Sequence, residues 1–238
     1  MEAVNPRQNR ILACLPDAEW QRWKPQLEQV NLPQGKVLYE SGATQSFVYF
    51  PTSAIVSLFN VLENGASAEI AVVGFEGLLG FATFMGGGST PGRAVVQSAG
   101  MGYRLHADIV KDEFERSAPV MHLMLHYTQA LITQMSQTAV CNRHHTLEKQ
   151  FGRLLLLILD RLPNNELVMT QELIAHMLGV RREGVTEAAL NLQKMGLIRY
   201  ARGHITVMDR DGLEGRVCEC YAVVKKEYDR LLPLRLAD

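Results

Sequence analysis

The chain has 238 residues, a formal net charge of −1, 47% apolar residues and 21% charged residues. These values are close to globular averages and exclude disordered, collagen-like and rod-like coiled-coil proteins. The longest apolar run, residues 154–159, is far shorter than a membrane span, and the first residues show no basic segment followed by an apolar one. We therefore expect a cytoplasmic protein with no membrane partner.

The cysteines are too few and too scattered for the disulfide framework of a small secreted protein. The sequence holds four: Cys14, Cys141, Cys218 and Cys220. The last three could be combined with His144 and His145 into a metal site. Because these residues are far apart in the sequence and lack paired spacing, we favour packed or solvent-facing roles and expect no metal.

Residues 5–30 predict short helices, one of which begins at Pro16-Asp17. From residue 30 the pattern changes to short β-rich segments that alternate with turn clusters. The predicted strands are residues 37–39, 47–50, 55–61, 68–73, 94–97 and 102–105. Short strands at even spacing, with no helices between them, are typical of an antiparallel barrel or sandwich. We expect such a domain over residues 1–118.

Residues 120–141 predict one long helix, since they contain neither proline nor glycine. Its residues form two adjacent stripes at helical spacing. The first stripe is Met121, Leu125, Thr128, Ile132, Met135 and Ala139, and the second is Val120, Met124, Tyr127, Leu131, Gln134, Thr138 and Cys141. One stripe can pack on the barrel, and we expect the first to pair with a second chain, as in a coiled coil. The alternative is a helix buried on both faces within one chain.

We assign residues 119–145 to this dimerisation helix and its hinge, and residues 146–238 to a second domain. Thr146 is expected to cap a helix that extends through Arg161. Residues 213–232 predict a final helix that packs on its own domain.

The segment MTQELIAHMLGVRREGVTEAAL shows the most specific local pattern of the chain. Counted from Gln171, the small residue Ala175 stands at the fifth position, where two helices must cross closely. Gly179 stands at the ninth, in a turn that needs a positive φ. Val180 and Val185, at the tenth and fifteenth positions, are apolar and hold the helices together. This spacing predicts a helix-turn-helix rather than an ordinary helical hairpin that binds nothing.

The residues that this pattern leaves exposed are of the types that DNA recognition uses. Arginine can hold guanine with two hydrogen bonds, glutamate can accept from the cytosine amino group, and a helix N-terminus favours a phosphate. Residues 197–208 predict a two-stranded wing that turns at Arg202, and residues 181–204 hold five basic and two acidic residues. The candidate DNA-binding residues are Thr170, Gln171, Arg181, Arg182, Glu183, Thr186, Glu187 and Arg202.

This order of elements resembles that of the Crp/Fnr family of bacterial transcription regulators. The resemblance covers nearly the whole chain and is carried by LPQGKVLYESG, VYFPTSAIVSL, VVGFEGLLG and the helix-turn-helix segment. It implies an α+β fold with an N-terminal antiparallel β-roll (jelly-roll-like and cyclic-nucleotide-binding-like), a long dimerisation helix and a C-terminal winged-helix domain. It also implies a dimer that binds a near-palindromic operator. Arg182-Glu183 match the family's recognition helix, whereas Glu187 replaces a residue that is often basic, which puts the usual operator sequence in doubt.

The resemblance places a degenerate effector site in the roll. Family members that bind cyclic nucleotides hold the ribose with Gly-Glu and the phosphate with Arg-Ser or Arg-Thr, and Glu76, Gly77, Arg93 and Ala94 occupy these places. Because alanine replaces the hydroxyl residue, we favour another small ligand, or none, over a cyclic nucleotide. A structural ion pair between Glu76 and Arg93 is the alternative. Only Cys14 lies near the N-terminus, so no iron–sulfur cluster is expected, and haem ligation has no positive support.

No phosphate-binding loop, nucleophile elbow, metalloprotease motif or dinucleotide fingerprint is present in the sequence, so we do not expect an enzyme. The expected partners are double-stranded DNA, a second copy of the chain, RNA polymerase and an unidentified small effector. The alternatives are a regulator that needs no ligand, and a ligand-binding or interaction module without catalysis.

Overall fold

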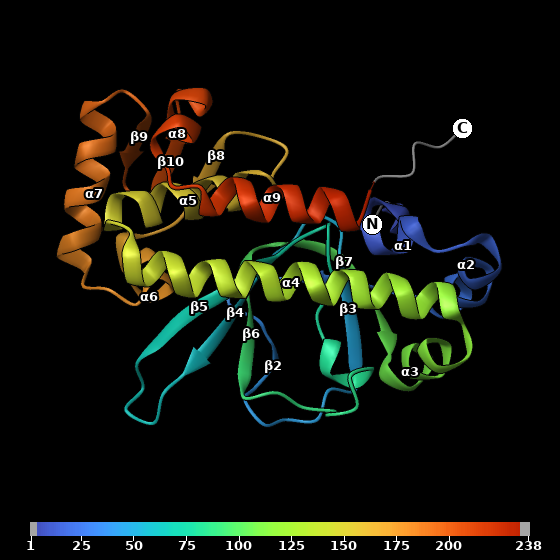
Figure 1. The fold of residues 1–238 in the computed structure, drawn as a ribbon. Coiled ribbons are helices and arrows are strands. Elements are labelled where there is room, and N and C mark those ends of the chain that lie inside the picture. Colours follow the sequence, from blue (N-terminus) through green and yellow to red (C-terminus); the bar gives the residue numbers. More distant parts are fainter. Residues whose placement is uncertain (1–3, 234–238) are drawn as a thin grey trace.

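The computed structural model describes residues 4–233 and consists of a β-roll, one long helix and a small C-terminal domain (Figure 1). Before the roll lie α1 (Arg10–Cys14) and α2 (Asp17–Trp23), and α3 (Ala107–Arg116) follows it. As expected, α2 begins directly after Pro16. The helix α3 was not predicted.

The roll is built from two antiparallel sheets with the strand orders β1-β7-β3 and β2-β6-β4-β5. Its strands are β1 (Glu28–Leu32), β2 (Val37–Tyr39), β3 (Phe47–Pro51), β4 (Ile55–Val61), β5 (Ser67–Val73), β6 (Gly92–Ser98) and β7 (Gly100–His106). All six predicted strands are present. The sequence prediction missed β1, which begins inside the segment that was expected to be helical. Its alternation is limited to Val30 and Leu32, too short for a clear strand pattern, and the strand is held by pairing with β7.

The long helix α4 (Ala118–His144) extends beyond both ends of the predicted segment. All seven residues of its second stripe are buried, as a helix packed on the roll requires. The first stripe is partly open. Leu125 is 43% exposed and Ile132 is 55% exposed, whereas Thr128 is buried and its hydroxyl donates to the Met124 carbonyl oxygen at 2.8 Å.

The C-terminal domain contains the predicted helix-turn-helix and a sheet with the strand order β8-β10-β9. Its elements are α5 (Leu147–Leu159), β8 (Glu166–Val168), α6 (Gln171–Leu178), α7 (Arg182–Lys194), β9 (Ile198–Ala201), β10 (His204–Val207), α8 (Arg210–Arg216) and α9 (Cys220–Leu231). The wing therefore has a third strand, β8, where the sequence predicted a turn and a two-stranded hairpin.

The expectation of one final helix packed on its own domain is wrong. The segment is divided into α8 and α9 by extended backbone at Val217, and α9 lies along α4 (Figure 1). Val224, Tyr228 and Leu231 of α9 recur at helical spacing and are buried. Leu213 of α8 is also fully buried.

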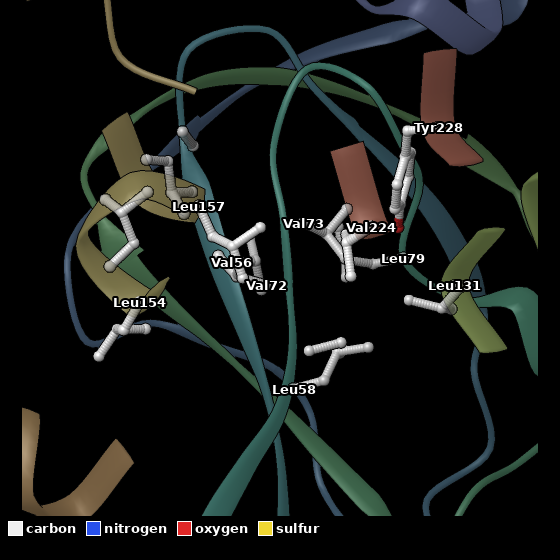
Figure 2. Packing of buried hydrophobic residues seen from close by; sticks show 14 of the residues in the cluster. Val56, Leu58, Val72, Val73, Leu79, Leu131, Leu154, Leu157, Val224 and Tyr228 are labelled. Atoms are coloured by element: carbon white, nitrogen blue, oxygen red, sulfur yellow. The ribbon is translucent and has the colours of Figure 1, made fainter. Parts of the chain in front are cut away.

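One hydrophobic core joins the roll to the C-terminal elements. Figure 2 shows residues of the roll packed together with residues of α4, α5 and α9. The labelled residues are Val56, Leu58, Val72, Val73, Leu79, Leu131, Leu154, Leu157, Val224 and Tyr228. The roll and the DNA-binding domain therefore share buried apolar surface, so this arrangement is stabilised by the hydrophobic effect.

A buried ion pair lies at the edge of this core. The Arg161 guanidinium, just after α5, contacts the Glu76 carboxylate of the roll at 2.7 Å, and both side chains are almost fully buried. The backbone N–H of Gly74 donates to the same carboxylate at 3.1 Å. Arg161 also donates to the Leu157 carbonyl oxygen and, at 3.5 Å, to Gln134 of α4. The pair thus connects the roll with both α4 and α5.

The two glycines around Glu76 make this approach possible. A Cβ atom on Gly74 would lie 2.9 Å from Cγ of Arg161, and a Cβ atom on Gly77 would lie 2.6 Å from Cε2 of Tyr127. Tyr127 is fully buried in α4 and donates its hydroxyl to the Leu78 carbonyl oxygen at 2.6 Å. The motif VVGFEGLLG therefore has a packing role at the contact of the roll with α4 and α5.

Replacing Arg161 by Met should destabilise the protein by about 3–5 kcal/mol, because it leaves the Glu76 carboxylate buried without its counter-charge. Adding Glu76→Gln to this variant should recover part of the loss. The free energy of unfolding from urea titration, followed by circular dichroism, measures both effects. The control is Arg93→Met, which removes a surface pair with Glu40 and should change stability by about 0–1 kcal/mol. Equal effects of Arg161→Met and Arg93→Met would contradict this account.

Candidate nucleic-acid interface

The helix-turn-helix is formed by α6, a short turn and α7, as the sequence predicted. Thr170 caps α6, since its hydroxyl oxygen accepts from the Leu173 N–H at 3.1 Å. Gly179 ends α6 with a φ of 65°, the left-handed conformation that glycine adopts most readily. Ala175 and Val185 are buried where the two helices cross. The pattern of small, turn and apolar residues therefore has the expected structural roles.

Gly184 lies inside α7, where glycine normally weakens a helix. A Cβ atom at this position would lie 2.7 Å from Cδ2 of Leu147 on α5. The glycine thus lets the recognition helix approach α5 closely. Its presence is explained by packing against the helix that connects the domain to the roll.

Four of the candidate DNA-binding residues line one groove. It has a volume of about 460 Å³ and lies between the start of α6, the start of α7 and the wing. The groove is lined by Thr170, Gln171, Glu172, Arg182, Tyr200, Arg202 and Gly203. Thr170, Arg182 and Arg202 are exposed, so the surface combines two guanidinium groups with a helix N-terminus. That combination suits a phosphate or a base edge.

Thr186 makes hydrogen bonds within the helix-turn-helix. Its hydroxyl is 2.9 Å from the Gln171 side-chain oxygen, to which it donates, and 3.1 Å from the Arg182 carbonyl oxygen. The residue is half-buried. Thr186 therefore links α7 to the start of α6 and holds Gln171 at the groove.

The remaining candidates lie at or beyond the start of α7. Arg181 is the residue before the helix, Glu183 is in its first turn, and both are exposed. Glu187 is also exposed, but it lines a second groove formed with α5 and α8, where Lys149 is a neighbour. The structure thus separates Glu187 from the groove that holds Arg182.

The wing turns through Arg202-Gly203, a two-residue hairpin loop in which both residues have positive φ values, 51° and 83°. Loops of this type favour Asn, Asp or Gly at their first position. Among residues 4–233, Arg202 is the only non-glycine residue with a positive φ. Its side chain is exposed at the tip of the wing.

Tyr200 is a groove residue that the sequence analysis did not single out. It lies on β9, where it donates its hydroxyl to the Met169 carbonyl oxygen at 2.7 Å. Burial raises the pKa of Tyr200 to about 12, although the nearby charge of Arg182 acts in the opposite direction. The tyrosine therefore stays protonated and lies close to Arg182. Tyr200 could have been identified as a surface residue of the wing from the alternation of exposed and buried positions along β9.

The helix-turn-helix also touches the roll directly, which the sequence did not predict. Nε2 of His176 on α6 is 2.6 Å from the Ser67 hydroxyl on β5. The His176 ring lies against Phe59 of β4, with 5.1 Å between the ring centroids. The hairpin formed by β4 and β5 is therefore a second point of contact between the roll and the DNA-binding domain.

The four residues of the expected effector cassette have different partners. Glu76 pairs with Arg161, and Gly77 packs against Tyr127. Arg93 pairs with Glu40 at 3.0 Å on the surface, and Ala94 is fully buried in β6. The alternative of an ion pair between Glu76 and Arg93 is wrong, because each has another partner.

Cys141, Cys218 and Cys220 are buried, as the expectation of packed roles requires, but their distance in the sequence does not keep them apart. Cys141, His145, Cys218 and Cys220 lie together, with their potential ligand atoms within 4.8 Å of one another, whereas His144 is exposed. Burial raises the pKa of the Cys141 thiol to about 12 and that of Cys220 to about 11. The contact arises because α9 lies along α4, a packing that spacing in the sequence cannot reveal.

Residues 151–216 match the family model of the Crp-like helix-turn-helix domain. The chain carries a Crp-like DNA-binding domain. This match confirms the predicted resemblance to Crp/Fnr regulators and supports a DNA-binding transcription regulator with double-stranded DNA as its partner. The matched segment holds α6, α7 and the wing, so the comparison bears on the DNA-binding domain.

Solved structures show the same fold over most of the chain. A transcriptional regulator of the Crp/Fnr family from Eubacterium rectale is 20% identical, with a TM-score of 0.68 and coverage of 84% of this chain and 94% of that chain. FixK2 from Bradyrhizobium japonicum is 15% identical, with a TM-score of 0.68 and coverage of 81% and 98%. A Crp-family regulator from Thermus thermophilus is 18% identical, with a TM-score of 0.64 and coverage of 80% and 99%. The predicted α+β fold is confirmed.

No curated protein sequence matches the chain significantly. Within residues 4–233, no helix is both long and apolar enough to cross a membrane.

Replacing Arg202 by Asn should have opposite effects on stability and on DNA binding. Asparagine tolerates the left-handed backbone better, so the variant should be as stable as the parent or more stable by up to about 1 kcal/mol. Loss of the guanidinium should weaken DNA binding and reduce the slope of log affinity against log salt by about one. Thermal unfolding and fluorescence anisotropy at several salt concentrations measure the two effects. An unchanged salt slope would contradict a phosphate contact at Arg202.

Proposed function

We propose that this protein is a homodimeric transcription regulator that reads a near-palindromic operator with the α7 helices of its two subunits. The observation that carries the proposal is the groove where the N-termini of α6 and α7 meet the wing and where Arg182 and Arg202 are exposed together. A recognition helix and a wing arranged in this way present side chains to a major groove and to the adjacent phosphates.

The residues of this surface divide into base-reading and positioning groups. Arg182 and Glu183, in the first turn of α7, read base edges through a guanine contact and a cytosine contact. Arg181, Arg202 and the capped N-terminus of α6 at Thr170 hold phosphates and fix the orientation of the helix. Glu187 points to the groove beside α5 and α8, so we assign it a role outside direct base reading.

The proposed dimer pairs the first stripes of two α4 helices. Met121, Leu125, Thr128, Ile132, Met135 and Ala139 alternate by four and three residues, the spacing of a two-stranded coiled coil. Leu125 and Ile132 are large apolar residues that the single chain leaves exposed, while the neighbouring stripe is buried. A second copy with the same repeat matches this surface. The dimer then presents its two recognition helices to half-sites about 34–36 Å apart.

Regulation by a small ligand in the roll is a further part of the proposal. A cyclic nucleotide is the less favoured effector, because Glu76 and Arg93 are engaged by Arg161 and Glu40. The contact of Ser67 with His176 offers a direct route from the roll to α6. We also propose contact with RNA polymerase, as transcription regulation implies.

Replacing Arg182 by Ala should weaken binding to an operator selected from random DNA by about 1–3 kcal/mol and relax the preference at one base pair. The measurement is fluorescence anisotropy with the selected operator and its single-base variants. The control is Arg230→Ala, which removes an exposed arginine on α9 that pairs with Glu227. If Arg182→Ala bound every sequence as the parent does, the assignment of α7 as the reading helix would be wrong.

Replacing Ile132 by Glu should convert the dimer into monomers, because it places like charges opposite each other in the middle of the paired helices. Light scattering coupled to size-exclusion chromatography gives the mass. Val223→Glu is the matched control, since Val223 is an exposed apolar residue on α9 outside the stripe, and this variant should remain dimeric. Dimers in both variants would refute the pairing of α4 helices and leave the DNA-binding assignment intact.

A further inference from the structure

Three thiols and one imidazole meet at the junction of the long helix with the DNA-binding domain. Cys141 is in the last turn of α4, and His145 directly follows this helix. Cys218 and Cys220 lie at the start of α9, and all three cysteines are buried. The Sγ atoms of Cys141 and Cys218 are 3.5 Å apart, and Sγ of Cys220 is 3.6 Å from Nδ1 of His145.

These distances fit a tetrahedral set of ligands. Zinc bonds of about 2.3 Å to sulfur and about 2.0–2.1 Å to nitrogen give tetrahedron edges of roughly 3.5–3.8 Å. The four potential ligand atoms lie within 4.8 Å of one another, so small side-chain rotations bring them to these edges. The separation of Cys141 and Cys218 is much longer than a disulfide bond of about 2.05 Å. Three sulfur ligands and one nitrogen ligand are a donor set typical of structural zinc sites.

We propose that Cys141, His145, Cys218 and Cys220 form a zinc-binding site that joins the end of α4 to the start of α9. The site does not depend on the proposed operator or effector.

The surroundings of His145 are those of a metal-ligating histidine. Its Nε2 lies 3.6 Å from the Glu219 carboxylate, while Nδ1 faces Cys220. A carboxylate on the far nitrogen fixes the orientation of the ring in many zinc sites. The Gln150 side-chain amide donates to the His145 carbonyl oxygen at 2.9 Å, which holds the backbone of this segment in place.

A buried arginine balances the charge that the site acquires. Three thiolates and one divalent zinc ion carry a net charge of −1, which needs a nearby cation when it is buried. Arg153 of α5 is almost fully buried and close enough to act on the pKa of Cys141. Its Nη1 lies 3.2 Å from the Thr138 hydroxyl, and its Nε has no hydrogen-bond partner in the described part of the chain. The zinc–thiolate group places negative charge beside this guanidinium, which is also close enough to the buried Glu69 carboxylate to act against the rise that burial causes in its pKa.

The site has a mechanical consequence. Cys141 and Cys218 are 77 residues apart in the sequence, and the C-terminal domain through α8 lies between them. A metal bridge at this point fixes the angle at which the long helix meets the DNA-binding domain. Metal loading therefore sets the relative position of the dimer helix and α9.

The test begins with the full-length protein, purified under reducing conditions without added metal. Elemental analysis should find one zinc ion per chain, and no stoichiometric iron. A chelator should remove the zinc. Titration of the metal-free protein with Co²⁺ should then restore one metal ion per chain, with the absorption spectrum of tetrahedral thiolate coordination. The absence of a stoichiometric metal, or an octahedral Co²⁺ spectrum, would overturn the proposal.

Variants assign the ligands. Cys218→Ser and His145→Gln should each lower bound zinc from one ion per chain to near zero after dialysis, whereas Cys14→Ser in α1 should retain it. Circular dichroism separates the loss of a ligand from unfolding of the variant. If a variant does not fold, the Co²⁺ titration of the parent chain decides whether the site binds metal. Equal zinc loss in Cys14→Ser, or full retention in both ligand variants, would show that the metal binds elsewhere. A Cys141–Cys218 disulfide that persists in protein purified under reducing conditions would also refute the site.

Discussion

The buried contact between Glu76 and Arg161 determines how the two halves of this protein meet. An ion pair removed from water loses much of its Coulombic gain to desolvation, so its geometry must be good to persist. Here the carboxylate also accepts from Gly74, and the guanidinium also donates to Leu157 and Gln134. Because the charges are satisfied from three elements, any other placement of α5 against the roll leaves one of them unpaired. The pair therefore selects one docked arrangement more than it adds stability.

The helix α5 carries this constraint to the DNA-binding surface. Its C-terminal end is followed by Arg161, and its first residue, Leu147, packs where Gly184 of α7 has no side chain. A helix of 13 residues is about 20 Å long and nearly rigid. The position of the recognition helix is thus set, through one helix, by a carboxylate in the roll. The cluster of Cys141, Cys218 and Cys220 lies near the other end of the same helix, where Gln150 contacts the end of α4.

Features governed by short-range patterns could be predicted from the sequence, and features governed by long-range packing could not. The strands and the helix-turn-helix follow from alternation and from a fixed spacing of small, turn and apolar residues. Glu76 resembled a ligand-binding residue, because its motif matches a nucleotide cassette and its partner, Arg161, lies 85 residues away. The apolar stripe of α9 has the same sequence pattern whether the helix packs on its own domain or on α4. The cysteine cluster depends on that choice, so its recognition required the tertiary structure.

The two contacts between the roll and the DNA-binding domain differ in strength, and this difference bears on regulation. The core around Arg161 combines a buried ion pair with extensive apolar burial, and its disruption costs several kcal/mol. The contact of α6 with the β4–β5 hairpin includes one hydrogen bond of His176, one ring contact with Phe59 and the close approach of Gly179 to Ala68, without a buried ion pair among the described residues. A single hydrogen bond contributes about 0.5–1.5 kcal/mol, which corresponds to a change of about 2-fold to 12-fold in an equilibrium. In the proposed regulator, a ligand that moves the β4–β5 hairpin can release α6 at this small cost while the Arg161 core stays intact. The weaker contact is therefore the better position for a switch, and the stronger one holds α5 and the recognition helix in place.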